Sequence, residues 1–246
     1  MKLGRIALGI GFACALLAGN ADASVTIGGT RVVYPLDQRE VTVKLDNDSA
    51  APSLVQVWMD DGHPDAKPGD IKVPFVITPP IFRMDAKKSQ TLRVIYSGEA
   101  LPTDRESVYW LNVLDIPPKV AGTTDANTLQ LAYRTRIKVF VRPAKLPGKP
   151  EDAPAQLTWK VAAASDGKGQ AVSVSNPTPY YVSFSEVDVE SGGHTYKNEK
   201  GGMVAPHATE VLPVAQMNAV SADAKVHYTA ISDFGGAMNG DATLAQ

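Results

Sequence analysis

The feature that most constrains this chain is an alternating stretch at residues 129–142, LQLAYRTRIKVFVR. Its apolar residues, which share one parity, are Leu129, Leu131, Tyr133, Ile137, Val139 and Val141, and its polar residues are Gln130, Arg134, Arg136, Lys138 and Arg142. Side chains of a strand point alternately to opposite faces, so the pattern predicts one strand with an apolar face and a basic face. At about 3.3 Å per residue it would span roughly 46 Å, against about 17–20 Å for a usual strand. Part of it is therefore expected to be available to a partner.

The N-terminus predicts a secreted protein. Lys2 and Arg5 precede an apolar run at residues 6–18, and residues 21–23 (ADA) offer small residues where a signal peptidase reads. The run is too short to span a bilayer, so we expect a cleavable signal peptide at residues 1–23 and a secreted mature chain with no membrane insertion.

Cysteine and charge narrow the class of protein further. Cys14 is the only cysteine and lies inside the apolar run, so it would leave with the signal. A secreted chain without disulfides must be stable through its core alone, which the remaining length allows. The 24 basic and 26 acidic residues nearly balance, which argues against nucleic acid as a partner.

Most of the chain reads as short strands, which predicts an all-β fold of sandwich domains. The expected strands lie at residues 25–34, 41–45, 54–59, 91–96 and 108–116, and then at 157–162, 171–174, 180–187, 210–214 and 226–232. Residues 237–246 are weakly apolar and predict only a short closing strand. No window predicts an amphipathic helix with caps.

A proline-rich stretch at residues 143–155, PAKLPGKPEDAPA, divides the chain. We expect an N-terminal domain at residues 24–145, a linker at 146–155 and a C-terminal domain at 156–246.

Motifs for catalysis and cofactors are not found. The four histidines are far apart in the sequence, and no HExxH, CxxC, GxSxG or glycine-rich phosphate loop occurs. We therefore expect no enzyme, no metal and no cofactor.

Several stretches resemble the periplasmic pilus-assembly chaperones, the PapD-like family. They occur in order along nearly the whole mature chain: residues 30–35 (TRVVYP), 77–80 (ITPP), 104–107 (DRES), 111–113 (LNV), 116–118 (IPP), 136–138 (RIK), 141–143 (VRP), 176–181 (NPTPYY) and 232–236 (SDFGG). The short connection between residues 116 and 129 is similar to the short-loop branch of the family.

The resemblance implies two immunoglobulin-like sandwiches set at an angle, with a cleft between them. It also implies a chaperone that binds, folds and caps pilus subunits by donor-strand complementation, without ATP, and delivers them to an outer-membrane usher. Self-capping as a homodimer is left open, as is the cis or trans state of the peptide bond at Pro79.

The resemblance also assigns site residues. Leu129, Leu131 and Tyr133 would be the donor residues, and burying all three would contribute roughly 5–9 kcal/mol before ordering costs. Arg31 and Lys138 would hold the carboxylate at the C-terminus of the subunit. Lys138 has the opposite parity from the donor residues, so a twist or bulge is expected to reconcile the two roles.

Glu106, Arg142 and Asp233 match the charge network that the family buries between its domains, which predicts a structural role for all three. Two other kinds of protein remain as alternatives. One is a periplasmic solute-binding protein or hydrolase, which requires a pocket with convergent polar groups. The other is an adhesion module built of the same sandwiches.

Overall fold

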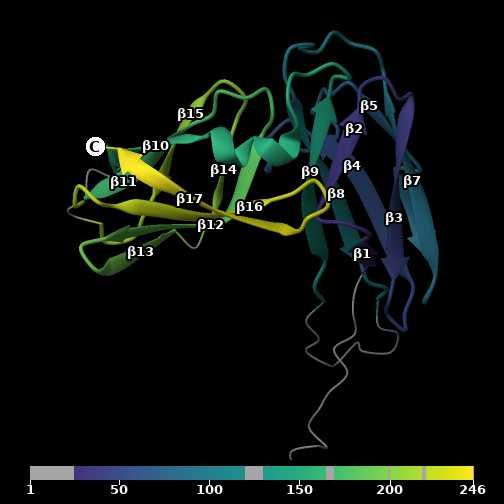
Figure 1. The fold of residues 1–246 in the computed structure, drawn as a ribbon. Helices are drawn as coiled ribbons and strands as arrows, with labels where there is room; N and C mark the ends of the chain where they lie inside the picture. The colour runs from purple at the N-terminus through teal and green to yellow at the C-terminus, as the bar shows by residue number, and fades with distance from the viewer. Residues whose placement is uncertain (1–24, 120–129, 165–168, 199, 218–219, 246) are drawn as a thin grey trace, which may run out of the picture.

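The computed structural model describes residues 25–119, 130–164, 169–198, 200–217 and 220–245. They form two β domains set at an angle to one another (Figure 1). The prediction of an all-β, two-domain immunoglobulin-like fold is confirmed. Its only helical elements in this part of the chain are two short 3-10 turns, η1 (Pro150–Asp152) and η2 (Pro154–Gln156). The predicted signal peptide lies outside the described residues.

The first domain is a sandwich of two sheets. One sheet has the strand order β1 (Val25–Ile27), β3 (Glu40–Asn47), β7 (Ser89–Tyr96) and β5 (Phe75–Thr78). The other has the order β2 (Arg31–Pro35), β9 (Tyr133–Arg142), β8 (Ser107–Ile116), β4 (Ser53–Asp60) and β6 (Ile81–Met84). Alternate side chains of both sheets, among them Leu45, Leu92, Leu111 and Val139, are buried in the core between them.

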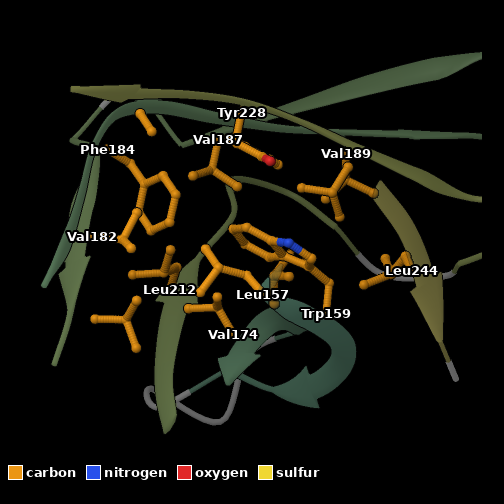
Figure 2. Close-up of a cluster of buried hydrophobic side chains, with 14 of the residues drawn as sticks. Leu157, Trp159, Val174, Val182, Phe184, Val187, Val189, Leu212, Tyr228 and Leu244 are labelled. Atoms are coloured by element: carbon orange, nitrogen blue, oxygen red, sulfur yellow. The ribbon is translucent and has the colours of Figure 1, made fainter. Parts of the chain in front are cut away.

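The second domain is one continuous hydrogen-bonded sheet. The sheet is curled, so that one of its faces encloses the core. Its order is β13 (His194–Asn198), β12 (Val182–Ser191), β16 (Lys225–Ile231), β17 (Ala237–Ala245), β10 (Thr158–Ala163), β11 (Gln170–Ser175) and β15 (Thr209–Pro213), and β14 (Gly202–Val204) pairs with β12. The aromatic rings of Trp159, Phe184 and Tyr228 pack against one another in its core, with centroids 5.5–5.9 Å apart (Figure 2).

Three of the predicted strands are corrected. Residues 25–34 form two strands in different sheets, because the chain crosses the sandwich at Gly28 and Gly29. The closing strand β17 is nine residues long, since it pairs with β16 along Ala237 to Thr243 and also with β10. The long strand begins at Tyr133, whose partner is Asp115 near the end of β8. Residues 130–132 are not strand, and Leu129 lies outside the described residues.

Four short strands were not predicted from the sequence: β5, β6, β13 and β14. β5 and β6 flank Pro79 and Pro80, and the Thr78–Pro79 peptide bond is cis. Part of the proline-rich stretch also belongs to the second domain, because Ala153 is fully buried in the core of that domain and Pro154 is buried as well. Within the described ranges, no helix has the length and apolar character that crossing a membrane requires.

Candidate functional site

Two cations lie together where the domains meet. Arg31 begins β2, and Lys138 is its direct partner in the parallel pairing of β2 with β9. The Lys138 Nζ donates to Ser183 Oγ in β12 at 3.0 Å, and the Arg31 Nη1 donates to the Ile231 carbonyl of β16 at 3.0 Å. Both cations belong to the first domain and both contact the second, so this pair lies at the base of the interdomain cleft.

Within the described ranges, neither cation is neutralised by a direct salt bridge. Burial, and next the neighbouring Arg31 charge, lower the pKa of Lys138 to about 8. Burial also lowers the pKa of Arg31, although Asp233 partly opposes the shift. No carboxylate among the described residues forms a salt bridge with either cation, and the buried Arg31 Nε has no hydrogen-bond partner there. A partly buried cation pair with spare donors is suited to binding an anion such as a carboxylate.

An open pocket adjoins this cation pair. Its walls include Trp110, Arg136 and Lys138 from the first domain, and Ser185, Ile231 and Ala237 from the second. The hairpin between β16 and β17 reaches across to the first domain at this point (Figure 1). The pocket therefore gives solvent access to the cations from between the domains.

One edge of β9 is only partly covered. β8 pairs with β9 from Tyr133 to Val141, whereas β2 pairs with it only from Lys138 onward. Among the described residues, 133–137 therefore pair with one strand only, and no described strand pairs with their other edge. We refer to residues 133–137 as the uncovered half of β9. Leu131 lies two residues before it in the chain.

The predicted donor residues that the structure describes are exposed at this edge. Leu131 is 49% exposed and Tyr133 is 56% exposed, whereas Ile137 and Val139, at the same parity, are buried in the core. The pairing of β8 with β9 has no shift in register, so the expected bulge is not found there. Donor residues and cations therefore project from opposite faces of the sheet.

Glu106, Arg142 and Asp233 form a connected ion-pair network across the domain interface. The Arg142 Nε donates to Glu106 Oε1 at 2.6 Å, and its Nη1 and Nη2 donate to the Asp233 carboxylate at 2.7 and 3.0 Å. The other oxygen of Glu106 accepts the Tyr181 N–H at 2.8 Å.

Burial and ion pairing act in opposite directions on the pKa values of this network. It raises the pKa of Glu106, even though the Arg142 charge and the Tyr181 N–H act in the opposite direction. Burial by itself would lower the pKa of Arg142, but hydrogen bonds and charges from Asp233 and Glu106 outweigh it and raise that pKa. Arg142 therefore remains charged and bridges the two domains.

Sequence reasoning missed two groups of residues around this site. Ser183 and the Ile231 carbonyl, which contact the cations, have no distinguishing sequence pattern, because serine and isoleucine are ordinary strand residues. Asp60 and Asn112 contact Arg136 and Arg134, and Asp60 could have been sought as a counter-charge of the basic face. In the described part of the chain, no cluster of histidine, cysteine and carboxylate side chains is arranged to hold a metal ion.

Comparison with known proteins identifies the family. Residues 24–147 match the N-terminal domain of the PapD pili and flagellar-assembly chaperones, and residues 152–242 match the C-terminal domain of the pili assembly chaperone PapD. The chain belongs to the PapD-like family of pilus-assembly chaperones. The resemblance stated from its motifs is thus confirmed, and its function is that of a fimbrial chaperone.

Individual relatives are similar in sequence over nearly the whole chain. The probable fimbrial chaperone YadV of Escherichia coli K12 is 48% identical, with 94% of each chain covered. The chaperone protein FimB/FhaD of Bordetella pertussis is 44% identical and covers 99% of this chain and 97% of its own. A crystal structure of the YadV chaperone superimposes with a TM-score of 0.77, covering 90% of this chain and all of the other. These relatives do not favour the solute-binding or adhesion alternatives.

A further solved structure contains a partner. The SafB chaperone in complex with the SafA pilin of Salmonella enterica is 27% identical to this chain. It superimposes with a TM-score of 0.74 and covers 92% of this chain and 99% of its own.

Proposed function

We propose that this chaperone lends the uncovered half of β9, with the residues just before it, to a fimbrial subunit whose own sheet lacks a strand. Leu131 and Tyr133 are half-exposed at this edge and would enter the apolar groove of such a subunit. Leu129 has the same parity and would be the third donor residue. Completing the subunit's sheet would supply the free energy of capture, so no nucleotide is required.

The observation that carries the proposal is the position of Arg31 and Lys138 relative to the free edge. β2 begins at Arg31 and covers β9 only from Lys138 onward. A subunit strand added along residues 133–137 would therefore end where β2 begins, beside both cations. If that strand runs parallel to β9, its last residue lies there and its terminal carboxylate can accept charge-assisted hydrogen bonds of about 1.5–3 kcal/mol each.

The anchor would also set the register of binding. Donor residues lie on one face of β9 and the cations on the other, and the backbone of an added strand lies between these faces in the plane of the sheet. A slip by one residue would turn each of its side chains to the wrong face. A carboxylate held by Arg31 and Lys138 would exclude such slips, because it fixes where the added strand ends.

The network of Glu106, Arg142 and Asp233 would then be structural. It ties the end of β9 to the second domain, which brings Ser183 and Ile231 to the cations. We assign it the role of holding the two domains at the angle that forms the anchor.

The cellular setting belongs to the same proposal. A predicted signal peptide at residues 1–23 supports a periplasmic location, and the SafB–SafA complex supports a pilin as the partner. Delivery to an outer-membrane usher would follow capture. Between clients, two copies could cover each other's free edge as a homodimer.

A pull-down from the native periplasm tests the anchor. Wild-type protein with a C-terminal tag is expected to retain small β-rich subunits, and Lys138→Ala is expected to retain none while staying folded. Lys160→Ala, a change of an exposed lysine on β10, is the matched control and should behave as wild type. Equal retention by Lys138→Ala would rule out the anchor.

A further inference from the structure

Two arginines lie beside the unpaired edge of β9, and within the described ranges they form no ion pair with the second domain. Arg134 and Arg136 lie on the uncovered half of β9, on the same face as Lys138. Lys138 contacts the second domain, whereas in the described part of the chain the hydrogen-bond partners of these two arginines all belong to the first domain. The basic face of the strand thus has two parts with different partners.

Two buried residues of neighbouring strands hold the arginines. The Asp60 carboxylate, at the end of β4, accepts Arg136 Nε at 2.8 Å and Nη2 at 2.5 Å. The Asn112 Oδ1, in β8, accepts Arg134 Nε at 2.9 Å and Nη2 at 2.6 Å. Asn112 Nδ2 donates to Asp60 at 2.7 Å, which joins the two halves into one network.

Tryptophan rings add a second contact for each arginine. The Arg134 Cζ lies 5.0 Å from the ring centroid of Trp58, and the Arg136 Cζ lies 4.5 Å from that of Trp110. A guanidinium that is both stacked on an aromatic ring and bound by two hydrogen bonds loses most of its freedom. The side chains of alternate residues along the uncovered half of β9 are therefore fixed.

The Asp60 carboxylate is buried, and it accepts several hydrogen bonds. It has no exposed surface, and it accepts the Gly62 N–H at 2.8 Å in addition to Arg136 and Asn112. Burial by itself would raise the pKa of Asp60, but hydrogen bonds from Arg136, Asn112 and Gly62 outweigh it and lower that pKa. The charge that holds Arg136 is therefore a permanent one at neutral pH.

This arrangement compensates for the missing strand neighbour. A strand paired on one side only opens more easily than one paired on both sides, and an opened donor strand would have to be ordered again at each binding event. We propose that Asp60 and Asn112 are positioning residues for subunit capture, which act through Arg134 and Arg136 to keep residues 133–137 extended before a subunit arrives. This inference rests on the proposed function of β9.

Amide hydrogen exchange of the mature protein, measured without any subunit, tests the positioning role. In Asp60→Asn, the amides of residues 133–137 that bond to β8 are expected to exchange at least about tenfold faster than in wild type. Amides of residues 138–142, which β2 covers, should be unchanged. If Asp60→Asn does not fold, Arg134→Gln replaces it, because Asp60 then keeps its partner Arg136.

Arg93→Gln is the matched control. It removes a two-fold arginine–carboxylate contact with Glu40 in the other sheet of the same domain, so it should leave residues 133–137 unaffected. Unchanged exchange of residues 133–137 in the test variant would overturn the inference. So would an equal increase throughout the first domain, since that would indicate a general loss of stability.

Pull-down of subunits then tests whether the order of residues 133–137 affects subunit capture. The variant with faster exchange is expected to retain at least about tenfold less subunit than wild type. Wild-type retention despite faster exchange would overturn the link to capture. Normal capture by Lys138→Ala would instead contradict the proposed anchor and leave the exchange result standing.

Discussion

If Lys138 anchors a subunit as proposed, its ionisation is expected to control capture. Its pKa of about 8 results from burial first and the charge of Arg31 second. A bound carboxylate would favour the protonated amine and raise that pKa again, so binding takes up protons near pH 8. For the folding of the free protein, the effect of pH has the opposite sign. Folding becomes more favourable as pH rises from about 8 towards the ordinary lysine pKa, because the unfolded chain then holds the extra proton.

Subunit affinity is therefore expected to fall as pH rises through about 8. The dissociation constant of a purified chaperone–subunit complex, measured between about pH 7 and about pH 9, checks this prediction. Lys138→Arg should bind with little dependence on pH in this range, because a guanidinium stays charged. The same pH profile for wild type and Lys138→Arg would contradict the assignment.

At the scale of the element, β9 is one strand with two environments. Residues 138–141 pair with both β8 and β2, whereas residues 133–137 pair only with β8 among the described strands. At one parity, Ile137, Val139 and Val141 are buried in the core, whereas Leu131 and Tyr133, nearer the N-terminus, are exposed. The point at which β2 begins separates the part of β9 that pairs with β2 from the part that we propose is lent to a subunit.

Leu131→Glu should abolish capture without unfolding the protein. Leu131 is half-exposed and lies before β9, so the free energy of unfolding is expected to change by no more than about 0.5 kcal/mol. In the complex, the new carboxylate would be buried in an apolar groove with no partner. Thermal melting and the periplasmic pull-down together measure both effects.

Val76→Glu is the control for that change. Val76 is 55% exposed and lies on β5 in the opposite sheet, so this variant should retain subunits as wild type does. Capture by Leu131→Glu at the level of Val76→Glu would mean that Leu131 is not a donor residue.

At the scale of the whole molecule, the anchor depends on how the domains sit together. Arg31 and Lys138 reach Ile231 and Ser183 across the interface, and Arg142 joins Glu106 to Asp233 beside them. The rings of Phe140 and Tyr181 also meet there, with centroids 5.8 Å apart. A change in domain angle would therefore alter the anchor, even though its cations belong to one domain.

Arg142→Ala is expected to destabilise the protein by about 3–5 kcal/mol, because Glu106 would remain buried without its cation. Urea unfolding measures the loss, and small-angle scattering measures the accompanying change in domain arrangement. Arg93→Ala removes an exposed ion pair and should leave the free energy of unfolding almost unchanged. A comparable, small loss in both variants would show that Arg142 does not support the interface.

Much of the fold follows from strand alternation. β3, β4, β7 and β8 were predicted within two residues at each end, because their core and solvent faces differ clearly. β5 and β6 are only four residues long and flank two prolines, so they have too few positions to show a period. β17 was underestimated because backbone pairing, rather than buried side chains, maintains it; of its described side chains only Leu244 is buried.

By itself, the sequence determined the two faces of β9, since side-chain direction along a strand is a local property of the backbone. Its ordered motifs also determined the family. Only the tertiary structure decided that β2 begins to pair with β9 at Lys138, so that no described strand covers that edge of residues 133–137. It also decided that Asp60 contacts Arg136. These contacts join segments far apart in the chain, and which of them form depends on how complete sheets and domains pack, which no local pattern encodes.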